Sequence, residues 1–211
     1  MTVAALVLAG GGSRRLGRPK QLLPWGGATL LDHVLDQVRR WGIDEIWVVL
    51  GAHAEEVRDQ VDLTGVGVVE NPEWEEGLAS SLRAGLDAIG RLSKMDGALI
   101  VMGDQPDVSD DVVTELVAAY RPGKTAAVVP KYRYTRGNPV LVDRLLWPRL
   151  MSLEGDEGAR RLLEAHPGWV TEVWLEHLPP RDVDTSFDVE ELQPRHIRHE
   201  VDEGRSPRSG V

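Results

Sequence analysis

Cysteine is absent from this sequence. Its absence excludes disulfides and thiolate-bound metal sites, and it fits a reducing compartment. No apolar run approaches the roughly 18–20 residues that a membrane helix needs. Residues 3–8 are apolar, but no basic residue precedes them and they lead directly into glycines, which is not the layout of a signal peptide. We therefore expect a cytoplasmic protein with no membrane partner.

The chain is acidic, with one basic segment near its start. The net charge is −10, which argues against a nucleic-acid partner. Residues 1–31 nevertheless carry Arg14, Arg15, Arg18 and Lys20 and no acidic residue. Because charges are screened over about 8 Å at cellular salt, this segment can dominate its own surroundings. The pattern predicts one local anion site.

The 211 residues, 42% of them hydrophobic, are enough for one sizeable core. Apolar runs typical of buried strands are found at 3–8, 46–50, 66–69, 98–102, 126–129, 140–142 and 170–175. Segments with helical spacing lie between them, at 28–41, 53–60, 78–90, 109–120, 143–152 and 157–165, and Ser109 is a plausible N-cap. From residue 193 the chain is polar and lacks periodicity, so we expect a single domain, 1–192, followed by a flexible tail, 193–211.

Repeated alternation of strands and helices predicts an α/β fold, in which helices cover both faces of a parallel sheet. Ligands of such sheets bind beyond the carboxyl ends of the strands. The segments 10–20, 70–81 and 103–107 each follow a predicted strand. We therefore expect these three segments to share one cleft.

The segment 8–20 reads Leu-Ala-Gly-Gly-Gly-Ser-Arg-Arg-Leu-Gly-Arg-Pro-Lys. Glycines let backbone N–H groups approach a polyphosphate. Arg15 and Lys20 would offset the repulsion between a triphosphate and a second anion, about 4 kcal/mol for unit charges about 4 Å apart. Arg15 stands where the third glycine of a dinucleotide fingerprint belongs, and no Walker Gly-Lys-Ser/Thr follows. We interpret the segment as a nucleoside-triphosphate loop; the alternative is a plain glycine turn.

Carboxylates suited to a metal follow the fourth strand and recur near the end of the domain. Asp104 lies at the expected mouth of the cleft, where it could hold Mg²⁺ or cap a turn. Asp182 and Asp184 are two residues apart, so in an extended segment they would point to opposite faces. Only one of them could then reach a metal held by Asp104; a solvated acidic loop is the alternative.

Two further segments offer groups for a substrate. Residues 71–81 bring hydroxyls to a helix start, where they bind ribose or phosphate or simply cap the helix. Residues 132–139 mix cations with aromatic rings. The second segment would receive a ring-bearing acceptor or form an exposed turn.

Taken in order, these segments resemble the molybdenum-cofactor nucleotidyltransferases of the MobA/MocA-like group. The likeness includes the loop at 8–20, Asn-Pro-x-Trp-x-x-Gly-x-x-Ser-Ser at 71–81, Gly-Asp-Gln-Pro at 103–106, Arg-Gly-Asn-Pro at 136–139, Leu-Trp-Pro-x-Leu at 146–150, Gly-Asp-x-Gly-Ala-Arg at 155–160 and Asp-Val-Asp-Thr at 182–185. It covers about residues 3–190 and is nearer to the cytidylyltransferase branch. Gly10, however, stands where that branch usually has alanine and matches the guanylyltransferase branch. Residues 184–188 read Asp-Thr-Ser-Phe-Asp instead of the family's Asp-Thr-Pro-Glu-Asp.

The resemblance implies a Rossmann-like three-layer αβα fold with a mixed, mostly parallel sheet, of the nucleotide-diphospho-sugar transferase type. It implies transfer of CMP or GMP from a nucleoside triphosphate to the terminal phosphate of molybdopterin, with release of pyrophosphate. Catalysis would fall to Arg15, Lys20 and Asp104, and Mg²⁺ would bind Asp104 with Asp182 or Asp184. The residues implied to bind nucleotide are Leu8, Ala9, Gly10, Gly11, Gly12, Ser13, Arg15, Lys20, Asn71, Gly77, Ser80 and Ser81. Those implied to face the acceptor are Arg136, Gly137, Asn138 and Asp156.

The reaction would be an in-line attack of an acceptor phosphate oxygen on the α-phosphorus. That oxygen is already ionised, so the enzyme would supply positioning and charge neutralisation and no general base. Three alternatives stay open. The chain could be a sugar- or polyol-phosphate nucleotidyltransferase, or a non-catalytic accessory protein with a molybdenum hydroxylase as partner. The third is a nicotinamide oxidoreductase, against which the missing dinucleotide fingerprint argues.

Overall fold

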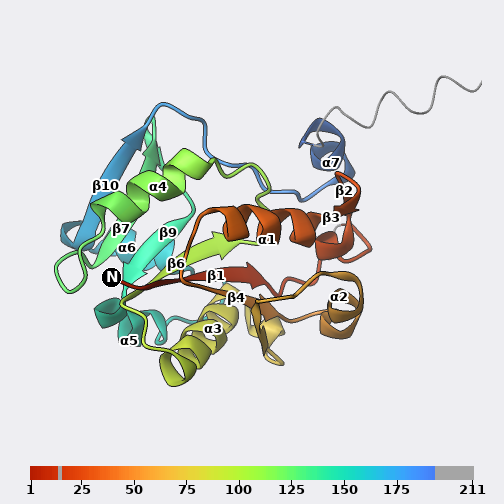
Figure 1. Ribbon diagram of the computed structural model, residues 1–211, viewed down its shortest axis with the longest axis horizontal. Coiled ribbons are helices and arrows are strands. Elements are labelled where there is room, and N and C mark those ends of the chain that lie inside the picture. The colour runs from red at the N-terminus through yellow and green to blue at the C-terminus, as the bar shows by residue number, and fades with distance from the viewer. Residues whose placement is uncertain (14–15, 193–211) are drawn as a thin grey trace, which may run out of the picture.

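The computed structural model describes residues 1–13 and 16–192. At its centre, β1 (Val3–Ala9) pairs in parallel with β4 (Glu45–Leu50) on one side and β6 (Gly97–Met102) on the other. The full strand order is β10-β7-β9-β6-β1-β4-β5, with β8 paired to β7 (Figure 1). The remaining strands are β5 (Gly67–Glu70), β7 (Ala127–Tyr132), β8 (Thr135–Arg136), β9 (Val140–Asp143) and β10 (Val170–Leu175).

One strand, β9, is antiparallel to its neighbours, but the strands β6, β7 and β10 around it all run in the same direction. β9 runs antiparallel to both β6 and β7, whereas β10 runs parallel to β7. The carboxyl ends of β7 and β10 therefore lie at the same edge as those of β1 and β6. This mostly parallel mixed sheet confirms the predicted fold class, and the edge is where ligands of such sheets bind.

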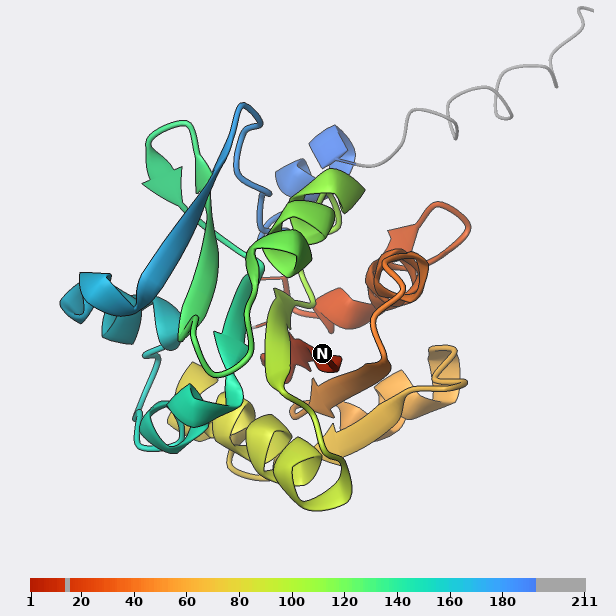
Figure 2. The ribbon, with the colours of Figure 1, turned by 60° about the vertical axis from the view of Figure 1, so that its left-hand side comes forward.

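Helices cover both faces of the sheet (Figures 1 and 2). On one face lie α1 (Leu30–Arg40), α2 (Ala54–Gln60) and α4 (Asp110–Ala119). On the other lie α3 (Leu78–Leu92), α5 (Trp147–Leu150) and α6 (Ala159–Ala165). No helix in the described part of the chain is long and apolar enough to cross a membrane.

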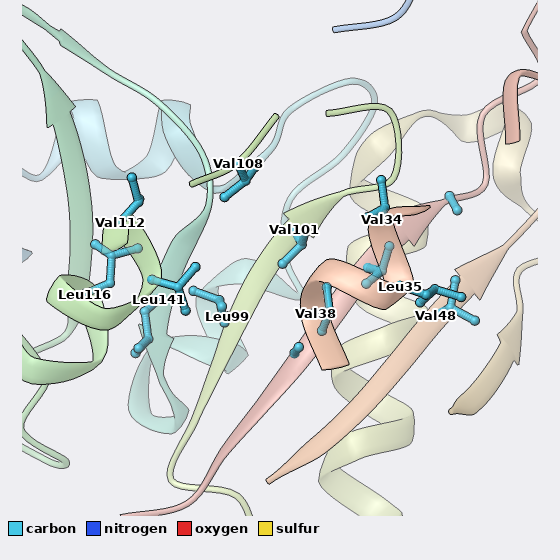
Figure 3. Packing of buried hydrophobic residues seen from close by; sticks show 14 of the residues in the cluster. Val34, Leu35, Val38, Val48, Leu99, Val101, Val108, Val112, Leu116 and Leu141 are labelled. Atoms are coloured by element: carbon cyan, nitrogen blue, oxygen red, sulfur yellow. The ribbon is translucent and has the colours of Figure 1, made fainter. Parts of the chain in front are cut away.

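Successive side chains of the central strands pack alternately into two separate hydrophobic cores. Leu99 and Val101 of β6 face α1 and α4, as Figure 3 shows. Ala98 and Ile100 of the same strand face α3. Because both faces of β1 and β6 are buried, these strands read as continuous apolar runs, which is why the sequence identifies them.

Most predicted elements are confirmed, but the start of the first helix differs. A helix was expected over 28–41, whereas α1 begins at Leu30. Ala28–Thr29 instead forms β3, which pairs with β2 (Pro24–Trp25) in a short hairpin. Thr29 and Asp32 form a reciprocal capping box, which fixes the helix start.

The predicted helix over 143–152 is wrong in its extent. A 3₁₀ turn (Arg144–Leu146) is followed by the single-turn α5. Pro148 lies in the first turn of α5, and because proline has no N–H, a helix running through it from residue 143 would lack one backbone hydrogen bond. Ser109 occupies the N-cap position of α4, but its hydroxyl donates to Asp111 and makes no capping bond.

A third, smaller core lies over the basic loop. It consists of Leu23, Trp25, Leu30 and Val183, with Leu16, Val189 and Leu192 packed against it. Val189 and Leu192 belong to α7 (Ser186–Leu192), which the sequence did not predict. This core joins the last described helix to the β2–β3 hairpin. The predicted tail, 193–211, lies outside the described residues, so its flexibility stays a prediction.

Candidate active site

The glycine loop follows β1, and it is packed too tightly for a side chain at Gly10 and Gly12. A Cβ on Gly10 would lie 2.9 Å from Oγ of Ser81, and one on Gly12 would lie 2.8 Å from the Trp74 ring. Gly11 has open space around it. The N–H of Lys20 donates to Oγ of Ser13 at 2.8 Å, which closes the loop upon itself. Ser13 thus links the two ends of the loop by an internal hydrogen bond. Arg14 and Arg15 lie outside the described residues.

Gln21 is a site residue that the sequence did not reveal. It lies in a 3₁₀ turn (Lys20–Leu22) and is 2% exposed. Its Nε2 donates to the carbonyl oxygens of Ala9, at 2.6 Å, and Gly11, at 3.1 Å. By holding these carbonyls, Gln21 fixes the orientation of the peptide planes in the glycine loop.

Lys20 joins two carboxylates that come from distant parts of the chain. Its ammonium contacts Asp104 and lies 3.3 Å from Oδ1 of Asp184. The Lys20 and Asp104 side chains are mostly buried, at 18% and 13% exposure, whereas Asp184 is 41% exposed. The structure therefore confirms that residues after β1, after β6 and near the end of the domain meet in space.

Burial and charge act in opposite directions on this pair. Burial alone would lower the pKa of Lys20, but the carboxylates of Asp104 and Asp184 outweigh it and raise that pKa. Burial raises the pKa of Asp104; the Lys20 charge opposes this only in part, and the charge of Asp182 adds to it. The Asp104 carboxylate would accordingly gain from one more positive charge nearby.

Asp182 and Asp184 flank Val183, which is buried and hydrogen-bonded to the loop of Asp104. Val183 is fully buried, and its N–H donates to the carbonyl oxygen of Asp104 at 2.9 Å. Asp184 contacts Lys20, whereas Oδ1 of Asp182 accepts from Nε2 of Gln105 at 2.7 Å. The two carboxylates thus engage different partners, and which of them would reach a metal at Asp104 stays a prediction.

The turn after Asp184 is stable without the proline found in the family's motif. Oδ2 of Asp188 accepts from the N–H groups of Asp184, at 3.0 Å, and Thr185, at 2.7 Å. The hydroxyl of Thr185 in turn accepts from the N–H of Asp188 at 3.3 Å. This reciprocal pair is a capping arrangement at the start of α7, and it holds Asp184 in place.

A cavity of about 370 Å³ opens beside these groups. Several of its walls are residues predicted from the sequence, namely Leu8, Ala9, Gly10, Gly11, Gly12, Lys20, Gly77, Ser81, Asp104 and Asp156. The cavity is also lined by Trp74, Glu75, Leu78 and Gly103, which fall within the segments 70–81 and 103–107 predicted to share the cleft, and by Gln21 and Met102, which fall outside the predicted segments. Trp74 is the tryptophan of the motif at 71–81 that carries the family resemblance.

Two predicted nucleotide residues support the wall without lining it. Asn71 and Ser80 are buried, and Nδ2 of Asn71 donates to Oγ of Ser80 at 2.8 Å and of Ser81 at 3.1 Å. Gly77 precedes α3 with a φ of 99°, and a Cβ there would lie 2.6 Å from Oδ1 of Asp156. Asn71 and Ser80 therefore position Ser81, and Gly77 allows Asp156 to approach.

The residues expected to face an acceptor fall into two places. Asp156 lies in the cavity itself. Arg136, Gly137 and Asn138 line a separate hollow of only about 30 Å³, and Nε of Arg136 donates to Glu172 at 2.7 Å. The structure does not bring this second group to the cavity that holds Lys20.

The donor set fits a magnesium ion that is completed by substrate. Oδ1 of Asp104 and Oε1 of Gln21 are buried oxygens without a hydrogen-bond partner among the described residues. Within that part of the chain, no group of three or more acidic or histidine residues is arranged to hold a metal alone. Mg²⁺ prefers one or two carboxylates plus substrate phosphates and waters, so Asp104 with one partner carboxylate matches its needs.

A glycine loop after the first strand, with a lysine and carboxylates at the carboxyl edge of a mostly parallel sheet, defines a nucleotidyltransferase of the nucleotide-diphospho-sugar transferase type. The model of the MobA-like NTP transferase domain matches residues 5–170. The chain therefore belongs to the MobA-like NTP transferase family.

Its relatives carry different names. "Nicotine blue oxidoreductase" of Paenarthrobacter nicotinovorans is 33% identical, over 90% of this chain and 93% of the relative. "Molybdenum cofactor cytidylyltransferase" of Escherichia coli is 24% identical, over 67% of this chain and 70% of the relative. The family is shared, whereas the named activities differ.

Solved structures superimpose on this chain over most of its length. A homologue of Rv0371c from Mycobacterium sp. strain JC1 superimposes with a TM-score of 0.80 at 36% identity, covering 90% of this chain and 94% of that one. The manganese complex of Rv0371C from Mycobacterium tuberculosis has a TM-score of 0.76 at 31% identity, covering 91% of this chain and 98% of that one.

Proposed function

We propose that this protein transfers CMP or GMP from the nucleoside triphosphate to the terminal phosphate of a molybdopterin-type acceptor, and that it uses Mg²⁺. The observation that carries the proposal is the junction of Lys20, Asp104 and Asp184 beside the glycine-lined cavity. The Escherichia coli relative named for this chemistry with CTP supports it. Position 10 is glycine, as in the guanylyltransferase branch, so GTP remains an equal candidate for the nucleotide substrate.

The groups of this chain would act by binding and by charge. Backbone N–H groups of residues 10–12 and the ammonium of Lys20 would hold the triphosphate, and Arg15 would add a second cation. An acceptor phosphate oxygen bonds to the α-phosphorus, the bond from that phosphorus to the bridging oxygen breaks, and pyrophosphate leaves. When bound, Mg²⁺ would neutralise charge on the α-phosphate and the leaving group.

Asp184 is the better partner for Asp104 in holding the metal. Lys20, a cation, already lies between these two carboxylates. Asp182, by contrast, accepts a hydrogen bond from Gln105 and stands on the other side of Val183. On binding triphosphate, Lys20 would exchange its carboxylate contacts for phosphate oxygens, and Asp104 and Asp184 would then face Mg²⁺.

A manganese-containing structure of a similar protein supports the proposed divalent-cation site. Rv0371C was solved with manganese and is 31% identical to this chain. Manganese and magnesium share a preference for carboxylate, carbonyl and water ligands. The carboxylates of Asp104 and Asp184 are ligands of this kind.

The test is a pyrophosphate-release assay with CTP, GTP, ATP and UTP, each with Mg²⁺. The acceptors are molybdopterin, its molybdenum-loaded form and a panel of sugar and polyol phosphates. We expect release with a molybdopterin acceptor and CTP or GTP. The Asp104→Ala variant should lose turnover and keep most of its nucleotide affinity. Asp107→Ala is the matched control, because Asp107 lies in the same loop and outside the cavity wall.

Other results would point to the alternatives. Release only with sugar or polyol phosphates would indicate that acceptor class instead. Binding of molybdopterin without release would indicate an accessory protein. The name of the Paenarthrobacter relative makes a redox activity the remaining alternative. It is tested by following NADH and NADPH oxidation with the same protein, where we expect no reaction.

A further inference from the structure

Trp174 is an exposed aromatic residue on the side of the sheet where the carboxyl ends of the parallel strands lie. It is the penultimate residue of β10, the edge strand beside β7 (Figure 2), and it is 65% exposed. The ammonium of Lys131, directly opposite on β7, lies 4.3 Å from the centroid of its ring. One side of the indole is thus covered by a cation, and most of the ring surface meets solvent.

The surroundings of Trp174 are held rigidly. Lys131 donates to Glu172 at 2.8 Å, and Arg136 donates to the other oxygen of Glu172 at 2.7 Å. Glu172 is two residues before Trp174 on the same strand, so both point to the same face of the sheet. One carboxylate therefore fixes two cations beside the ring and leaves one net positive charge.

That face is also the face of the nucleotide cavity. Val170, in phase with Glu172 and Trp174, packs in the second core together with Leu8 and Met102. Leu8 and Met102 line the cavity. Trp174 and the cavity thus lie on one side of the sheet and at one edge.

Three hollows with shared lining residues lie between the two places. The nucleotide cavity shares Asp156 with a hollow over residues 154–164, and that hollow shares Arg160 with the small hollow lined by Arg136. Arg136 leads through Glu172 to Lys131 and Trp174. Three strand spacings separate β6 from β10, which is about 14 Å at about 4.8 Å each.

We propose that Trp174 is the stacking platform for a planar, fused-ring end of the acceptor, whose phosphate reaches Asp104 and Lys20 past these hollows. The inference rests on the proposed function, because that function puts the reacting phosphate at Lys20 and the nucleotide on the α3 side. The acceptor must then extend toward β7 and β10. The site takes a phosphate monoester whose flat ring lies about 14 Å from the phosphate, a distance set by the strand spacing.

The test uses flavin mononucleotide as probe, since it carries a fused ring and a phosphate monoester and its fluorescence falls when it stacks on an indole. It is titrated into the protein with Mg²⁺ and α,β-methylene CTP or α,β-methylene GTP. We expect the probe to bind with quenched fluorescence, and we expect Trp174→Ala to lower its affinity about tenfold. Trp174→Phe, which keeps a ring, should retain most of the affinity. Ribose 5-phosphate should compete weakly, because it has no ring.

Tyr134→Ala is the matched control, because Tyr134 is an aromatic residue that is 89% exposed on the turn between β7 and β8. It should leave probe affinity unchanged. Thermal shifts with the methylene nucleotides should be the same in all four proteins, which separates this site from the nucleotide site.

Absence of probe binding, or equal binding by Trp174→Ala and the unsubstituted protein, would overturn the inference. So would a change in oligomeric state on Trp174→Ala with unchanged probe affinity, which would make Trp174 a protein contact. If no triphosphate yields pyrophosphate but probe affinity still depends on Trp174, the proposed function fails and the ring site stands.

Discussion

The ammonium of Lys20 lies 3.3 Å from Oδ1 of Asp184, although the two residues are 164 positions apart in the sequence. Lys20 reaches this position from the end of the glycine loop, and Asp184 reaches it from the segment that crosses the sheet edge to α7. The contact places a positive charge where a triphosphate would need one. The predictions below address this contact and its supports.

Replacing Asp184 by Asn should weaken metal binding more than replacing Asp182 by Asn. Asp184 contacts Lys20, which also contacts Asp104, whereas Asp182 accepts a hydrogen bond from Gln105. Titration with Mn²⁺ followed by electron paramagnetic resonance measures affinity without turnover. We expect a loss of about tenfold or more for Asp184→Asn, from removal of one charged ligand. A larger loss for Asp182→Asn would make Asp182 the ligand.

Replacing Gln21 by Leu should loosen the glycine loop. The substitution removes two hydrogen bonds and leaves the carbonyl of Ala9 without this donor. The expected cost is about 1–3 kcal/mol in the free energy of unfolding, with weaker nucleotide binding. Calorimetry measures both. Gln37→Leu is the control, since Gln37 is another buried glutamine and contacts Val108 instead of the loop; it should leave nucleotide affinity unchanged.

Replacing Gly10 by Ala should strain the contact with Ser81. The new Cβ would lie 2.9 Å from Oγ of Ser81, and overpacking of this kind costs about 1–3 kcal/mol. Adding Ser81→Ala should restore part of the lost stability, so the two substitutions should not be additive. Urea denaturation of the four proteins measures the coupling. Additive losses would mean that the strain is relieved elsewhere. Thermal shifts with CTP and GTP on the same proteins test the role of position 10 in base choice.

Acid should weaken the Glu172 ion pairs. Hydrogen bonding from Lys131, and further contacts with Arg136, lower the pKa of Glu172 in the folded protein. Its contribution to stability is therefore complete above the ordinary pKa of glutamate, about 4.3. That contribution is lost as pH falls through the lower pKa of the folded state. Glu172→Gln should have a shallower fall of Tm with pH below about 4.3. Glu164→Gln, which removes an exposed pairing with Arg160, should follow the original curve.

The sequence identifies the parts of the fold that depend on burial and repetition. β1 and β6 are buried on both faces, so their apolar runs are unmistakable. The glycines, Lys20 and Asp104 could be found because each follows such a strand. The β2–β3 hairpin was missed because each of its strands has only two residues. The α7 helix was missed because it owes its place to the third core.

The rest of the site depends on contacts that no local pattern encodes. Gln21 looks like an ordinary polar residue in the sequence, and its role follows from the positions of Ala9 and Gly11. Arg136 and Asp156 were grouped together for the acceptor, yet they occupy different hollows, because Arg136 is held by Glu172. Such facts depend on packing between distant strands.

The buried Val183 also sets when the site can exist during synthesis. Its N–H bonds to Asp104, its side chain fills the third core, and Asp184 follows it. Every strand in the described part of the chain ends before residue 176, so a nascent chain can complete this sheet on the ribosome while Lys20 and Asp104 still lack Asp184. Translation must release residues 182–192 before the three charges meet. The sheet of the nascent protein is therefore expected to form before Lys20, Asp104 and Asp184 come together.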